Sequence, residues 1–318
     1  MNILHHKTIV GFIGMLVLLL LLAALPGCQP AAETSAGTVL AEGECTFEFP
    51  EYNERSDLSV DQEEPVYGDV NRGEVVIGSM HCPGLWDHAG FVGVQDFLNA
   101  DWYEVGDTVN PKEWNGYIEY IPDDGGAWSG WTHADDWTTV YQTLEGDGEL
   151  EGRRLEIEGN LETSKAKYRI VQVGDTPVAE TPEAAGTVLA EGETVCEYTV
   201  SEVIEGLKRE EPGYGEVDRG GILVGVMDCP GMFENARFIL LNTLIAGGSE
   251  SSLPTEWNAF LEFITDDGGA WRGTSHIVDN INNTTLKGEG VHEGKRMEYG
   301  LNPVTGEATY RIIQVSEQ

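Results

Sequence analysis

The chain is poor in basic residues. Its 318 residues include 18 Lys and Arg against 55 Asp and Glu, which gives a formal net charge of −37. A field of this sign repels the phosphates of DNA and RNA, so nucleic-acid partners are excluded. The acids are spread through both halves of the chain, which is typical of a solvated surface and also of adaptation to a salty habitat.

The usual signatures of metal sites and nucleophiles are also missing. No Cys-x-x-Cys pair or His cluster indicates zinc. The adjacent acids Asp123-Asp124 and Asp266-Asp267 lack the EF-hand spacing of a calcium loop and are typical of turns. No G-x-S-x-G nucleophile motif is present. The sequence therefore predicts no metal site and no cofactor, and it favours a non-enzymatic protein over an enzyme.

One aromatic-rich segment occurs twice. It reads EWNGYIEYIPDDGGAWSG at Glu113–Gly130 and EWNAFLEFITDDGGAWRG at Glu256–Gly273. Asp-Gly between two apolar runs predicts a β-hairpin, because Gly accepts the positive φ of a tight turn. The tails Tyr168–Val173 and Tyr310–Val315 also match. The chain therefore contains a duplicated domain.

The pattern predicts an all-β protein after an N-terminal signal helix. Each repeat shows about eight short runs separated by turn signals, which indicates two tandem homologous antiparallel barrel-like domains. The polar segments Glu51–Gln62 and Asn99–Lys112 are expected to be loops. The expected boundaries are a signal peptide at 1–27, a tether at 28–36, repeat one at 37–173, a linker at 174–185 and repeat two at 186–318.

A glycine-rich pattern follows each hairpin. It comprises Trp128, Gly130, Gly146, Gly148, Glu151 and Gly152, with the counterparts Trp271, Gly273, Gly288, Gly290, Glu293 and Gly294. This pattern resembles the small barrels of the calycin and allene-oxide-cyclase/dirigent kind. The resemblance implies an interior that holds a small apolar ligand.

The N-terminus carries an export signal. Ile9–Leu25 is an uncharged run that suits a signal-peptide core. The following Leu25-Pro26-Gly27-Cys28 resembles the bacterial lipoprotein box, although Pro26 is unusual at its position. The resemblance implies cleavage before Cys28, lipidation of that residue, and a membrane-anchored protein of the cell envelope that faces outside the cytoplasm. An uncleaved anchor helix is the alternative.

The other four cysteines fall two per repeat. Cys82 and Cys229 lie in the same Cys-Pro-Gly motif. Cys45 and Cys196 lie in the first strand of each repeat, offset by two residues, which keeps a side chain on the same face of a strand. We therefore expect the disulfides Cys45–Cys82 and Cys196–Cys229, with buried free thiols as the alternative.

Two kinds of recurring polar residue are candidates for chemistry. Glu119 and Glu262 lie mid-strand between aromatic and aliphatic residues, where burial would raise the pKa of an acid–base carboxylate. His133 and His276 occupy equivalent positions after the hairpin. For all four residues a structural, hydrogen-bonded role is the competing interpretation.

Four tryptophans occur only in repeat one, namely Trp86, Trp102, Trp131 and Trp137. Aromatic residues in polar loops often mark binding surfaces, so this asymmetry points to repeat one if a single repeat binds a ligand. A better-filled core explains it equally well.

The sequence thus favours a lipid-anchored extracytoplasmic module that binds a small apolar ligand or another envelope protein. A barrel enzyme of isomerase or cyclase-like activity and a purely structural spacer are the alternatives. A cavity with a polar group would favour binding or catalysis, and a solid interior would favour the spacer.

Overall fold

The computed structural model describes residues 37–65, 67–98, 103–105, 108–110, 113–134, 138–173, 186–211, 215–244, 256–278 and 281–315. The expected signal peptide, Cys28, the tether and the linker lie outside the described residues. Within the described ranges, no helix has the length and apolar character needed to cross a membrane.

The described residues of repeat one form twelve strands and two short 3₁₀ helices, η1 (Ser56–Leu58) and η2 (Gly148–Leu150). The strands are β1 (Thr38–Thr46), β2 (Glu48–Arg55), β3 (Val60–Glu64), β4 (Gly68–Cys82), β5 (Trp86–Leu98), β6 (Tyr103–Val105), β7 (Thr108–Asn110), β8 (Glu113–Pro122), β9 (Ala127–Ala134), β10 (Thr139–Asp147), β11 (Arg153–Asn160) and β12 (Lys165–Gln172). β6 and β7 pair only with each other, and the other ten form one antiparallel sheet.

Repeat two forms a second ten-stranded antiparallel sheet. Its strands are β13 (Thr187–Val195), β14 (Glu197–Ile204), β15 (Leu207–Glu211), β16 (Gly215–Cys229), β17 (Phe233–Leu244), β18 (Glu256–Thr265), β19 (Gly269–Val278), β20 (Ile281–Gly290), β21 (Lys295–Leu301) and β22 (Glu307–Gln314). The protein is therefore all-β, with two sheets in tandem, as the duplicated pattern predicts.

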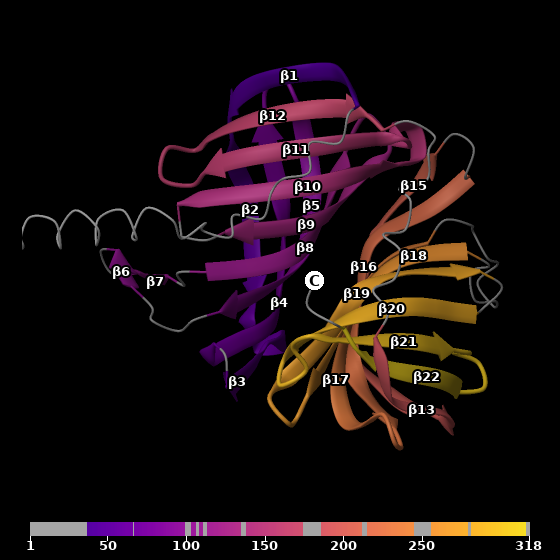
Figure 1. Ribbon diagram of the computed structural model, residues 1–318. Helices are drawn as coiled ribbons and strands as arrows, with labels where there is room; N and C mark the ends of the chain where they lie inside the picture. Colours follow the sequence, from indigo (N-terminus) through magenta and orange to yellow (C-terminus); the bar gives the residue numbers. More distant parts are fainter. Residues whose placement is uncertain are drawn as a thin grey trace, which may run out of the picture. The chain divides into compact units, whose positions relative to one another are not determined.

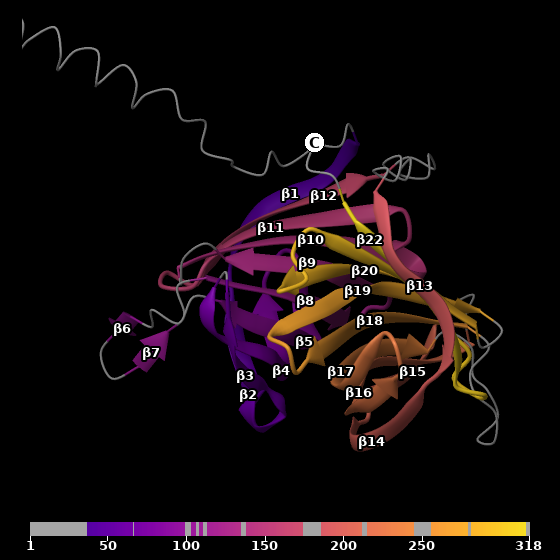
Figure 2. The same ribbon diagram turned by 60° about the horizontal axis from the view of Figure 1, so that its bottom comes forward.

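Each sheet curls into a half-barrel (Figures 1 and 2). The strand order in repeat one is β1-β12-β11-β10-β9-β8-β5-β4-β2, and β3 pairs with β4 outside this path. β1 and β2 lie at the two ends of the path, yet only Phe47 separates them in the chain. Cys196 separates β13 from β14 in the same way. Continuous chain thus joins the two ends of each sheet.

Two segments predicted as loops contain strands. Glu51–Gln62 includes the end of β2 and the start of β3, and Asn99–Lys112 includes β6 and β7. The side chains of β2 are exposed apart from half-buried Arg55, so the strand carries polar residues and shows no apolar alternation. The loop prediction was wrong there because backbone pairing with β4, and not burial, holds β2 in place.

The repeated hairpin forms as its turn residues predict. In repeat one it joins β8 to β9, and Gly125 and Gly126 both have positive φ, of 114° and 65°. In repeat two it joins β18 to β19, with Gly268 at φ 87°. Only Gly adopts these values at low cost, so both turns depend on it.

The expected disulfide pairing is confirmed. Cys45 is bonded to Cys82 and Cys196 to Cys229. The first bond joins the end of β1 to the end of β4, and the second joins the residue between β13 and β14 to the end of β16. Disulfides persist in oxidising compartments, so both bonds indicate an extracytoplasmic environment.

Each half-barrel has its own apolar interior, and the two repeats also share a third core. The shared core contains Leu58, Val75, Val92 and Val94 of repeat one with Ile222, Val224, Ile239, Leu241, Phe260 and Ile264 of repeat two. Val75 faces this core while its neighbour Val76 faces the interior of repeat one. β4 is thus buried on both faces, which explains its continuous apolar run.

The contacts between the repeats follow a local two-fold symmetry. Tyr117 stacks on its own counterpart Phe260, with ring centroids 4.9 Å apart. Arg72 contacts Glu289 at 2.9 Å, and their counterparts Arg219 and Asp147 repeat this contact at 2.9 Å. Reciprocal contacts of this kind are typical of an isologous interface.

Candidate functional site

The interior of repeat one contains a half-open cavity of about 580 Å³. Its wall is largely aromatic, and the rings come from β2, β5 and β8 and from the residue between β1 and β2: Phe47, Phe49, Tyr52, Phe91, Trp114 and Tyr120. Strand alternation directs these side chains inward while their neighbours face outward. The volume lies in the range of small-molecule pockets, and an apolar wall with a few polar groups is typical of them.

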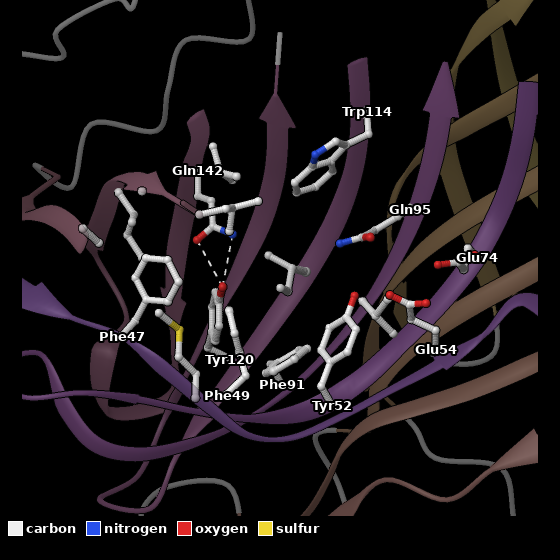
Figure 3. A pocket seen from close by; sticks show the side chains of 18 of the residues that line it. Phe47, Phe49, Tyr52, Glu54, Glu74, Phe91, Gln95, Trp114, Tyr120 and Gln142 are labelled. Atoms are coloured by element: carbon white, nitrogen blue, oxygen red, sulfur yellow. Dashed lines mark hydrogen bonds between the residues drawn. The ribbon is translucent and has the colours of Figure 1, made fainter. Parts of the chain in front are cut away.

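Polar groups lie at two sides of the cavity (Figure 3). On one side the Gln142 amide and the Tyr120 hydroxyl are joined, with Gln142 Nε2 donating to the hydroxyl over 3.1 Å. On the other side, Figure 3 shows Glu54, Glu74 and Gln95 grouped near the Tyr52 hydroxyl. The cavity therefore has an apolar body and one acidic side.

Glu74 is the buried acid of this group. Burial raises the pKa of its carboxyl to about 7, and the negative charge of Glu54 adds to the shift. The carboxyl is therefore partly protonated near neutral pH and becomes fully charged in mildly alkaline solution.

Repeat two has larger side chains at two of the equivalent positions. On β21, Tyr299 and Leu301 lie opposite Tyr310 and Ala308. The equivalent positions of β11 hold Ile157 and Gly159, which lie opposite Tyr168 and Ala166. Both Tyr299 and Leu301 belong to the core of repeat two. Gly159 instead lines the cavity of repeat one, where an added Cβ would lie 3.8 Å from Phe47 Cε1, an ordinary contact.

The structure places the two described tryptophan candidates outside the cavity lining. Trp86 is buried in the core of repeat one, with its ring centroid 5.1 Å from that of Tyr120. Trp131 is 43% exposed on the outer face, where Arg272 of repeat two lies over its ring. Trp102 and Trp137 lie outside the described residues. The tryptophan of the cavity wall is Trp114, for which repeat two has Trp257 at the equivalent position.

Glu119 also faces away from the cavity. It is buried against repeat two, where Thr243 Oγ1 donates to its Oε1 over 2.8 Å and Arg219 Nη1 lies 3.4 Å away. Burial raises the pKa of Glu119, and the charge of Arg219 and the bond from Thr243 oppose that shift.

Glu262 occupies the counterpart of this position and has poorer contacts. Neither of its carboxyl oxygens has a hydrogen-bond partner among the described residues, and Arg72 Nη1 lies 3.9 Å from Oε1. Burial and the neighbouring charge of Asp96 raise the pKa of Glu262 well above its ordinary value. Both carboxylates thus belong to the contact between the repeats.

The two histidine candidates lie on the outer face of the sheets. His133 is half-buried on β9 between Asn115 and Tyr141 of the flanking strands. His276 is exposed, and its Nδ1 lies 2.7 Å from Asn258 Oδ1. Neither lines the cavity, and these surroundings suit the structural interpretation.

A buried arginine cluster was missed by the sequence analysis. Arg72, Arg219 and Arg272 are almost completely inaccessible to solvent and pair with acids of both repeats. Arg72 and Arg219 each precede a Gly and an apolar strand, in Asn-Arg-Gly and Asp-Arg-Gly. This recurrence is the signal that could have identified them.

Comparisons with protein families, with curated proteins and with solved structures found no match to this chain. The geometry of the cavity therefore carries the functional interpretation.

Proposed function

We propose that the protein is an exported, lipid-anchored binding protein whose first repeat holds a small apolar molecule. The observation that carries the proposal is the aromatic cavity of about 580 Å³ inside repeat one. A spacer gains nothing from such a cavity, because close packing of the same side chains would make the domain more stable. The resemblance to calycin-like barrels supports the same role.

The anchor is the second part of the proposal. Cys28 is the one cysteine that neither disulfide uses, and it ends the lipoprotein-box motif. The disulfides indicate an extracytoplasmic protein, and a lipid on Cys28 would hold it at the envelope membrane. The binding repeat would then face outside the cytoplasm.

A non-enzymatic role fits the cavity better than catalysis by the candidate acids. Glu119 and Glu262 contact arginines between the repeats and do not line the cavity. They are too far removed from a molecule bound there to exchange protons with it. An isomerase or cyclase-like activity therefore has no support from these residues.

The test is native mass spectrometry of the chain from Gln29 onward, which retains the compact unit of residues 37–318. Protein purified from its own host should carry a small apolar molecule of defined mass. The matched variant Gly159→Leu, which copies Leu301 of repeat two, should purify empty. An apolar molecule that the variant retains equally well would place binding elsewhere and contradict the proposal.

A neutral apolar fluorophore, N-phenyl-1-naphthylamine, supplies a second readout. Its emission should rise on binding to the wild-type protein and stay low with Gly159→Leu. If the wild-type protein neither carries a molecule nor binds the fluorophore, the cavity does not act as a binding site and the proposal fails.

A further inference from the structure

One carboxylate lines the cavity without a partner from the described part of the chain. The Glu74 side chain on β4 is 7% exposed, and it lines the cavity. Among the described residues no hydrogen bond or opposite charge acts on its carboxyl, which is influenced by burial and by the negative charge of Glu54. Figure 3 shows its carboxylate directed toward Gln95 of the neighbouring strand.

The duplicated fold does not require an acid at this position. In repeat two Gly221 lies opposite Asn242, as Glu74 lies opposite Gln95. Removal of a carboxylate from water costs free energy unless hydrogen bonds or an opposite charge compensate it. An acid that repeat two lacks, and that no described group of the protein pairs, indicates a partner from outside the chain.

The rest of the lining determines the charge of that partner. Among the described residues, the lining includes two acids, Glu54 and Glu74, and no Lys, Arg or His. The other groups that face Glu74 are Tyr52 of β2 and Gln95 of β5 (Figure 3). A bound anion such as a fatty acid would meet like charges, whereas a cation would be attracted.

The aromatic wall favours an organic cation. The rings of Tyr52 and Phe91 lie 6.2 Å apart next to the acidic side. Aromatic faces attract ammonium groups and at the same time pack against an apolar body. A bare metal ion would gain little from such a wall and would require more oxygen ligands than these two carboxylates supply.

We propose that repeat one selects apolar molecules that carry a basic nitrogen, with the protonated nitrogen beside Glu74 and Glu54 and the apolar body against the aromatic wall. The inference rests on the proposed function and specifies the chemical class of its ligand. A neutral apolar molecule fills the same cavity but leaves Glu74 unpaired, so it binds more weakly.

The experiment compares three compounds with the same dodecyl chain: dodecylamine, dodecanol and dodecanoate. Each displaces N-phenyl-1-naphthylamine from the chain that begins at Gln29, below its micelle-forming concentration and near pH 8. A charge-assisted hydrogen bond at Glu74 should let the amine displace the fluorophore at an about tenfold lower concentration than the alcohol. The carboxylate should be the weakest of the three.

Two variants identify the group responsible. Glu74→Gln keeps the shape of the side chain and removes its charge, so the amine should lose its advantage while the alcohol binds as before. Glu158→Gln removes one exposed acid from the outer face of β11 and controls for net charge. It should leave the amine preference intact.

The outcomes separate the two proposals. If the fluorophore binds but the amine is no better than the alcohol, or if Glu74→Gln keeps the preference, the inference is overturned and the binding function stands. If the wild-type protein does not bind the fluorophore at all, the proposed function fails, and the inference fails with it.

Discussion

Replacement of Arg72 by Met should destabilise the folded protein far more than loss of an exposed arginine. The Arg72 side chain has no solvent exposure. It donates to Glu64 at 2.6 and 3.1 Å, to Asp96 at 2.5 Å and, in the other repeat, to Glu289 at 2.9 Å. The substitution removes the arginine that pairs with Glu64, whereas Asp96 and Glu289 keep Arg272 at 3.0 and 3.5 Å.

The size of the effect follows from burial. Breaking a buried ion pair by removing one partner costs about 3–5 kcal/mol, because the remaining charge stays desolvated. Met retains much of the apolar stem of Arg72, so the loss is mainly electrostatic. The matched control is Arg169→Met, whose ion pair with Glu156 spans 3.6 Å with both side chains about one-third exposed. Exposed pairs contribute about 0–1 kcal/mol.

The assay is urea unfolding followed by tryptophan fluorescence, at neutral and at acidic pH. The repeats share a core, so we expect one cooperative transition. Burial by itself raises the pKa of Asp96, but the charges of Arg272 and Arg72 hold it below its ordinary value. In the wild-type protein this contribution to stability is present above the unfolded pKa of Asp96 and is lost as the pH falls through the folded pKa.

The deficit of the variant against the wild type should depend on pH. Without Arg72, the burial of Asp96 is opposed by Arg272 alone, so the pKa of Asp96 rises above its value in the wild-type protein and the folded variant binds protons that the folded wild type has released. The deficit in stability therefore shrinks as the pH falls through the acidic range. A loss at neutral pH no larger than that of Arg169→Met, or a deficit independent of pH, would refute the role of Arg72 as the central cation of this interface.

The remaining predictions concern the cavity and the anchor. Gly159→Leu should raise the free energy of unfolding by up to about 3 kcal/mol, because it buries four carbons at about 0.8 kcal/mol each. Leu301→Gly in repeat two should lower the free energy of unfolding by about 2–5 kcal/mol. Thermal denaturation tests both, and a destabilised Gly159→Leu would contradict the presence of free space. Burial and a neighbouring carboxylate raise the pKa of Glu74 to about 7. Because an amine pairs with the charged form, the affinity for dodecylamine should rise with pH through this value and should not change with pH in Glu74→Gln. Fluorophore displacement at several pH values measures this affinity. Cys28→Ser should release the protein from membranes on fractionation, and continued tight retention would favour an uncleaved signal helix.

The features that the sequence predicted correctly depend on short-range rules. The hairpins follow from Asp-Gly-Gly turns, which few other residues can form. The disulfides follow from the repeat and from strand parity, since a shift of two residues keeps Cys45 and Cys196 on the same face. Neither argument needs any knowledge of what covers the outside of the sheet.

The contact between the repeats cannot be predicted without knowing what covers the outside of each sheet. Glu119 and Arg219 are separated by 100 residues, and Arg72 and Glu289 by 217. Alternation shows that Glu119 lies on one face of its strand but does not show which element packs there. The continuous run at Val75 and Val76 was the available sign that both faces of β4 are buried.

The resemblance to small barrels implies a ligand-holding interior, but the sequence did not predict which residues line it. Extra tryptophans in repeat one suggested a binding surface, yet Trp86 packs in the core and Trp131 lies outside the cavity lining. The informative positions in repeat one carry smaller residues. Gly159 stands where repeat two has Leu301, and a difference of that kind creates space without adding any motif.

Comparison of the repeats locates the specialised part of the molecule. The contact surface keeps its reciprocal pairs. Gly73 packs close to Ile239, and the counterpart of Gly73, Gly220, packs close to Val92, the counterpart of Ile239. A change on this surface alters contacts with the other repeat, so both copies remain constrained. The interiors do not touch each other and are free to differ. Repeat two has Tyr299 and Leu301 in its core. Repeat one has instead a cavity lined by Glu74, which no described group pairs, and a buried acid without a partner costs stability and therefore points to a ligand.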